Sequence, residues 1–138
     1  MGAFETRDAM SLNRRLQLLL VLLIAWDVLA IIAELSFGGF LFDASDGEIT
    51  GLLGARGGFN GLPVVMIAAY AYCLARGPVR HRGVLWLAAI EQGAGTLFAV
   101  YHLATGDVRF EAAIVPLVVS AGLFVLVLVH MPRGQLTT

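Results

Sequence analysis

The sequence contains no lysine and a single cysteine, and only 14% of its 138 residues are charged. About 25% of the residues of a soluble domain are charged, so this chain is poor in charge for a soluble protein. The lone cysteine, Cys73, excludes an intramolecular disulfide and a redox-active thiol pair, and its apolar neighbours favour a small buried side chain. Together with a hydrophobic content of 59%, the scarcity of charge identifies a membrane protein.

Several motifs of known chemistry are also missing. There is no HExxH, CxxC, GxSxG or phosphate-loop spacing, so zinc, thiol, serine-hydrolase and nucleotide chemistry have no sequence support. His81, His102 and His130 fall at different ends of the apolar segments and make a poor bis-histidine haem site. A net charge of −1, with arginines scattered between apolar runs, argues against a nucleic-acid partner. The sequence predicts no metal site and leaves any cofactor unknown.

Four apolar segments follow one another along the chain, at residues 16–37, 58–75, 84–104 and 112–131. Each is close to the ~20 residues that a helix needs to cross ~30 Å of hydrocarbon. Backbone groups in lipid must bond within their own segment, so runs without strand-like alternation are expected to be helices. We therefore predict an all-α membrane protein of one domain, residues 1–138, folded as a four-transmembrane-helix bundle in the lipid bilayer.

The arginines predict the orientation of this bundle. Because arginine is favoured on the cytoplasmic side of membrane proteins, the side that holds more of them is expected to be inside. One side holds Arg7, Arg14, Arg15, Arg76, Arg80, Arg82 and Arg133, and the other holds Arg56 and Arg109. This bias predicts that both termini are cytoplasmic, in an integral protein of a bacterial-type inner (plasma) membrane.

Acidic residues interrupt the first and third apolar segments. Asp27 and Glu34 are seven residues apart, which places them on one helical face about 10 Å apart. Glu91 and His102, eleven residues apart in the third segment, also share nearly one face. Counted from the cytoplasmic ends, Asp27 and Glu91 have similar depths, and Glu34 and His102 both fall in the outer third. We expect an acid–acid layer and, nearer the outside, an acid–histidine layer.

Such residues are costly in a membrane. An ionised side chain at mid-membrane costs roughly 2.5–3.5 kcal/mol, so intramembrane acids must be paired, protonated or hydrated. If Asp27 and Glu91 approach each other, one of them is expected to hold a proton at neutral pH. His102 would compensate the charge of Glu34 or accept its proton. These four residues are the candidate catalytic or proton-handling groups; the alternative is that they only hydrogen-bond helices together.

The second apolar segment begins irregularly. Its clean apolar run, residues 62–75, is preceded by GLLGARGGFNGLP at residues 51–63. Backbone interrupted by glycine and proline at membrane depth is tolerated where it lines a cavity, although Pro63 also suits the first turn of an ordinary helix. The glycines of EQGAG, residues 91–95, would let another helix pack close to Glu91. The candidate ligand-binding residues are Arg56, Asn60, Gln92 and Tyr101.

Three functions are compatible with these features. The first is a small, transport-like protein that handles protons or a small ligand at its carboxylate/histidine site. The second is an intramembrane enzyme of isomerase or cyclase type that acts on a lipid-like substrate by acid–base chemistry. The third is an accessory subunit of a larger membrane complex. Because four short helices enclose little space, we also expect a homo-oligomer or a larger membrane complex.

Overall fold

The computed structural model describes residues 2–41, 62–106 and 110–132, and these residues are helical apart from short turns. The four helices are α1 (Gly2–Leu41), the helix Leu62–Arg76, α3 (Arg82–Thr105) and α4 (Phe110–His130). A 3-10 turn, η1 (Pro78–Arg80), joins the second helix to α3. The prediction of an all-helical chain is therefore confirmed.

Three of these helices are long and apolar enough to cross a membrane, as expected of an integral membrane protein. The stretches concerned are Ser11–Ala33 within α1, Arg82–Thr105 and Ala113–His130. The helix Leu62–Arg76 is apolar but shorter. At 1.5 Å per residue it measures about 22 Å, less than the ~30 Å of a hydrocarbon core.

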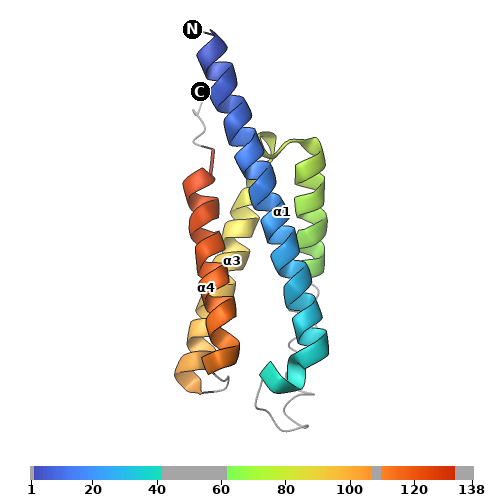
Figure 1. Cartoon of the computed structure of the whole chain (residues 1–138), viewed down its shortest axis with the longest axis vertical. Coiled ribbons are helices and arrows are strands. Elements are labelled where there is room, and N and C mark those ends of the chain that lie inside the picture. Colours follow the sequence, from blue (N-terminus) through green and yellow to red (C-terminus); the bar gives the residue numbers. More distant parts are fainter. Residues whose placement is uncertain (1, 42–61, 107–109, 133–138) are drawn as a thin grey trace.

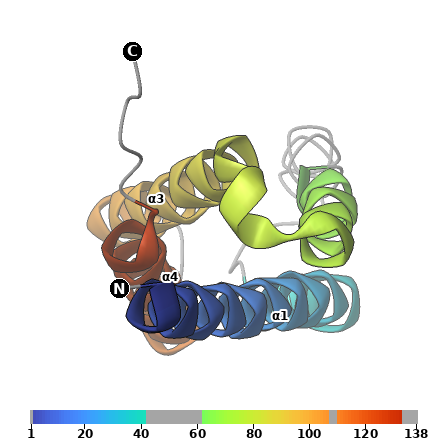
Figure 2. The same ribbon diagram turned by 90° about the horizontal axis from the view of Figure 1, so that it is seen from above.

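The helices alternate in direction, so that consecutive helices are antiparallel (Figure 1). The first turns of α1, the η1 turn and the last turn of α4 lie at one end of the molecule. Seen from that end, α1 and α3 lie on opposite sides, with α4 and the helix Leu62–Arg76 between them (Figure 2). This arrangement directs one face of α1 and one face of α3 toward a shared interior.

The helix α1 begins at Gly2, fourteen residues before the start that hydropathy indicates. Its 40 residues span about 60 Å, about twice the thickness of the hydrocarbon core. Polar residues such as Glu5 and Arg7 do not interrupt a helix outside the membrane, so hydropathy marks only the apolar part of a longer helix. The N-terminal part of α1 projects beyond the other helices (Figure 1).

One apolar core joins all four helices. On α1 it is formed by a stripe at helical spacing that includes Leu16, Leu20 and Leu23. The remaining members are Leu19, Met66, Tyr70, Cys73, Leu85, Ala88, Ala89, Leu123 and Val127. Cys73 is fully buried, in agreement with its expected role as a small apolar side chain.

Small residues on α3 allow α4 to pack closely against it. A Cβ atom added to Gly93 would lie 3.2 Å from Cε2 of Phe124, and one added to Gly95 would lie 3.5 Å from the Ser120 hydroxyl oxygen. The α3–α4 interface is the most extensive helix–helix contact outside the second helix. Close approach through small residues is the usual means of helix association in membranes, where lipid removes the hydrophobic driving force.

The turn between the second helix and α3 depends on Gly77. Its φ of 97° lies in the left-handed region, which a side chain at this position would disfavour. The Gly77 amide donates to the Cys73 carbonyl oxygen at 3.0 Å and closes the preceding helix, and the Gly77 carbonyl accepts from the Arg80 amide at 3.2 Å. Pro78 follows and is buried. This turn fixes how the two helices are aligned.

Substitution of Gly77 by alanine is expected to lower the free energy of unfolding by about 1–2 kcal/mol, because alanine is strained at positive φ. Gly83→Ala is the matched control, since Gly83 lies inside α3 and a Cβ there meets nothing within 4 Å. The control should be neutral or stabilising by up to ~1 kcal/mol. Thermal unfolding in mild detergent measures both variants. Equal stability of the two would contradict a conformational requirement at Gly77.

Candidate functional site

Asp27 lies inside the bundle because it continues the buried stripe of α1. It follows Leu23 by four residues and Leu20 by seven, so its side chain points the same way as these leucines. Only 4% of Asp27 is exposed, and its Oδ2 atom is buried without a hydrogen-bond partner within the described residues. Asp27 interacts electrostatically with Glu91 of α3 and with Tyr70 of the second helix. The first and third helices thus bring two acids to one region of the interior.

Glu91 is held by side chains from two helices. The fully buried Tyr70 donates a hydrogen bond from its hydroxyl to Oε2 of Glu91. The Nε2 of Gln92 donates to the same oxygen at 3.5 Å. Among the described residues, no partner of Glu91 carries a positive charge, and the same is true of Asp27. We refer to Asp27, Tyr70, Glu91 and Gln92 as the acidic cluster.

Gln92 is itself buried, with 3% of its surface exposed. Its main-chain carbonyl accepts a hydrogen bond from the Thr96 hydroxyl at 2.8 Å, one helical turn later. Its side-chain Oε1 is buried without a partner within the described part of the chain. The cluster therefore contains two buried oxygen atoms that accept no hydrogen bond there, one on Asp27 and one on Gln92.

Tyr70 is the cluster member that sequence analysis did not select. The helix Leu62–Arg76 and α3 are antiparallel neighbours joined by a tight turn, so residues at similar distances from the turn meet. Tyr70 precedes Arg76 by six residues, about 9 Å, and Glu91 follows Arg82 by nine, about 14 Å. Since these lengths agree within one helical turn, counting outward from the turn would have indicated this contact.

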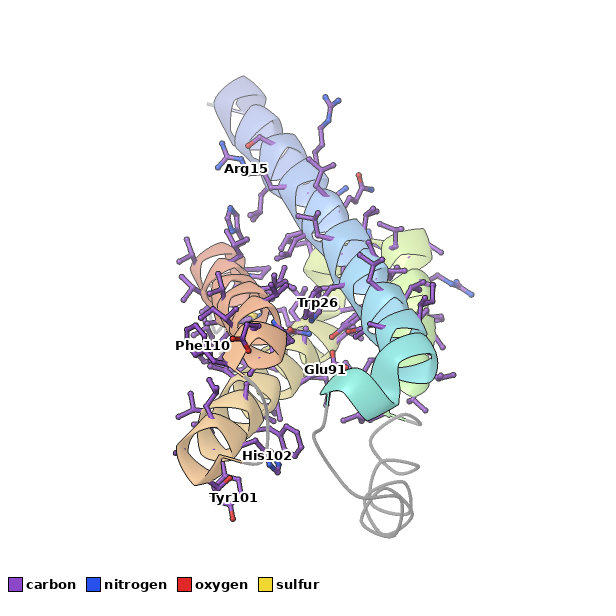
Figure 3. All side chains as sticks on the ribbon, turned by 60° about the horizontal axis from the view of Figure 1, so that its bottom comes forward. Arg15, Trp26, Glu91, Tyr101, His102 and Phe110 are labelled. Atoms are coloured by element: carbon purple, nitrogen blue, oxygen red, sulfur yellow. The ribbon has the colours of Figure 1, made fainter. Side chains whose placement is uncertain are left out.

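His102 lies far from the acidic cluster. It follows Glu91 by eleven residues, about 16 Å along α3, and falls in the last turn of that helix. Its ring centroid is 4.2 Å from that of Phe98 and 5.2 Å from that of Tyr101. Figure 3 shows Glu91 in the middle of the bundle and His102 with Tyr101 near the end of α3. Tyr101 is largely exposed, as a residue that faces lipid or the membrane surface would be.

The remaining candidate residues are Arg56, Asn60 and Glu34. Arg56 and Asn60 lie outside the described residues, as does the side chain of Glu34, although the backbone of Glu34 belongs to α1. The acid–histidine layer of Glu34 and His102 stays a prediction. Of the two expected layers, the described residues contain the acid–acid region of Asp27 and Glu91.

The cluster offers oxygen atoms rather than the nitrogen and sulfur ligands that favour transition metals. Over residues 2–41, 62–106 and 110–132, no three histidine, cysteine, aspartate or glutamate side chains come together. Comparisons with protein-family models, with curated proteins and with solved structures find no match. Function is therefore inferred from the chemistry of the residues themselves.

Replacing Tyr70 by phenylalanine is expected to destabilise the protein by about 1–3 kcal/mol, because Glu91 loses a buried donor. Tyr72→Phe is the control: Tyr72 lies two residues away on the same helix, and its ring, which Arg76 and His81 contact, is kept. Thermal unfolding in detergent compares the two variants. The effect of Tyr70→Phe should largely vanish in a Glu91→Leu background, because leucine offers no acceptor to the Tyr70 hydroxyl. An undiminished effect there would assign it to packing instead of the hydrogen bond.

Proposed function

We propose that this chain is a small transport-like protein whose acidic cluster takes up and releases a proton or a small cation inside the membrane. In this proposal it has four transmembrane helices and both termini in the cytoplasm, in a bacterial-type inner membrane. The observation that carries the proposal is the convergence of Asp27 and Glu91, from different helices, in an interior where neither acid has a positively charged partner among residues 2–41, 62–106 and 110–132.

The cost of burying charge supports an exchangeable proton or ion at this place. Two ionised carboxylates close together in a medium of low dielectric constant repel each other and lose their hydration. A proton or a cation bound there removes both costs. Side chains that serve only to join helices would be expected to satisfy one another, whereas Oδ2 of Asp27 has no partner within the described residues.

Burial favours a small transported species over a lipid-like substrate. Asp27 is 4% exposed and Tyr70 is fully buried, so reaching the cluster from lipid would require the helices to separate. A proton or a dehydrated ion needs a much smaller opening than a lipid. Transport therefore agrees with this geometry better than acid–base catalysis on a lipid-like molecule.

The distribution of arginine supports the proposed orientation. Arg14, Arg15, Arg76, Arg80 and Arg82 are all exposed. They occur near the start of α1 and around η1, which lie at the same end of the bundle (Figure 1). This end would face the cytoplasm. The short helix Leu62–Arg76 would be accommodated by local thinning of the bilayer.

The proposed orientation predicts the behaviour of reporter fusions. A reporter active only in the cytoplasm should be active when fused after residue 138 and inactive when inserted within residues 43–56, with the opposite result for a reporter active only outside. An inactive cytoplasmic reporter after residue 138 would overturn the orientation.

The transport proposal predicts that Asp27→Asn abolishes proton movement. Asparagine keeps the size of the side chain but cannot ionise, so flux into liposomes should fall about tenfold or more. Purified protein is reconstituted with a pH-sensitive dye inside the vesicles, and flux is driven by a membrane potential and, in a separate experiment, by a sodium or potassium gradient. Ser120→Ala is the control, since Ser120 is a buried polar residue of the α3–α4 interface outside the cluster.

Both variants are first checked for normal insertion and thermal unfolding. Full flux in a correctly folded Asp27→Asn protein would leave the acidic cluster with only a helix-joining role. Equal loss in Ser120→Ala would point to a general packing defect.

A further inference from the structure

We propose that the acidic cluster binds one partly dehydrated monovalent metal cation through side-chain oxygens of Asp27 and Gln92, and that this cation competes with a proton for Asp27. The inference rests on the proposed function and names its substrate class: an alkali-metal ion that is exchanged for a proton.

The hydrogen-bonding capacities of the four side chains carry this proposal. The cluster has two kinds of donor, the Tyr70 hydroxyl and the Gln92 amide NH2, and both are directed at Oε2 of Glu91. Two acceptors then remain buried without a donor in the described structure, Oδ2 of Asp27 and Oε1 of Gln92. Turning the Gln92 amide over would bring its oxygen against the Glu91 oxygen, where it would be repelled.

Buried acceptors without a partner are unfavourable, and only a donor or a cation satisfies them. Carboxylate and amide oxygens are ligands preferred by hard cations. Both side chains are more than nine-tenths buried, so a cation bound here would lie away from bulk water, with two protein oxygens replacing part of its hydration shell. The site therefore has the ligand chemistry of an alkali-metal site.

The charge of the cluster favours a monovalent ion over a divalent one. Glu91 already accepts two hydrogen bonds at Oε2, which partly compensate its charge, and this leaves Asp27 as the acid without a donor at Oδ2. Calcium takes six to eight oxygen ligands, and magnesium keeps a nearly octahedral shell that contains several waters. A single uncompensated carboxylate with one amide oxygen matches a smaller charge.

The metal ion and a proton are expected to compete, because both bind the carboxylate of Asp27. Within the described residues, the titratable groups that act on Asp27 are Glu91 from α3 and Tyr70 from the second helix. The residues of α4 that share the apolar core with the leucine stripe of α1 are Leu123 and Val127, which do not titrate. A proton on Asp27 removes the charge that the metal ion requires, so the protonated and metal-bound forms exclude each other. Exchange at this one residue would couple the movement of the two ions.

A tryptophan next to Asp27 provides an intrinsic fluorescence probe for the test. Trp26 precedes Asp27 and packs partly buried against the core, whereas Trp86 is half exposed on α3. Trp86→Phe thus leaves Trp26 as the only tryptophan. Full-length protein with this substitution is titrated in detergent with sodium chloride, with choline chloride holding the ionic strength constant. Potassium and calcium chlorides are tested in the same way, and binding of radiolabelled sodium gives a second measurement.

We expect a saturable response to an alkali-metal ion that choline does not produce. Its apparent dissociation constant should rise up to about tenfold for each unit of decreasing pH when one proton competes. Asp27→Asn should abolish binding, and Gln92→Leu, which has no side-chain oxygen, should weaken it about tenfold or more. Ser120→Ala should bind as the parent does. Normal thermal unfolding of each variant separates loss of binding from loss of fold.

Identical responses to sodium, potassium and choline would overturn the proposal, as would a response to calcium alone or undiminished binding by Asp27→Asn. Proton flux that depends on Asp27, without any metal response, would overturn the metal site and leave the proposed proton transport intact. Metal binding without flux in liposomes would support the site and contradict the transport function.

Discussion

The placement of two carboxylates inside an apolar helical bundle, Asp27 buried and Glu91 partly buried, is the constraint on which the interior of this protein depends. A charged side chain loses its hydration in such a place, and two like charges add mutual repulsion. The surroundings of Glu91 are what this cost demands: a buried tyrosine hydroxyl and a buried amide donate to its carboxylate. Asp27 lacks an equivalent partner at Oδ2, and this difference between the two acids underlies the proposed exchange of ions.

The fold supplies this arrangement through features that are individually ordinary. A turn closed at Gly77 aligns the second helix with α3 and brings Tyr70 to Glu91. Glycines at positions 93 and 95 allow α4 to pack closely on α3. The leucine stripe of α1 directs Asp27 inward. The members of the cluster are positioned by the same helix packing that stabilises the bundle. A substitution that shifts one of these helices would therefore change the site as well, so stability and ion handling would be coupled.

The two acids of the cluster were predicted from the sequence, whereas Tyr70 was not. The inward orientation of Asp27 follows from its spacing to Leu20 and Leu23, and the similar depths of Asp27 and Glu91 follow from counting residues along two helices. Tyr70 was not recognised, because tyrosine in an apolar segment is equally typical of a membrane-interface anchor. Its role depends on a partner in another helix, and a single helical pattern contains no information about that partner.

The sequence by itself determined the class of the protein. Hydrophobic runs in a charge-poor chain require helices that satisfy their own backbone hydrogen bonds, and acids within those runs mark where burial is expensive. Hydropathy did not determine the length of α1, since polar residues continue a helix beyond the membrane.

Only the tertiary structure decided which side chains meet. It brought the Tyr70 hydroxyl and the Gln92 amide to Glu91 and placed His102 about 16 Å farther along α3. The physical reason is that the spacing of residues along one helix fixes only the direction in which each side chain leaves that helix. Contact between two helices depends also on how each is rotated about its axis, on their crossing angle and on their alignment along the axis. Those quantities arise from packing across the whole bundle.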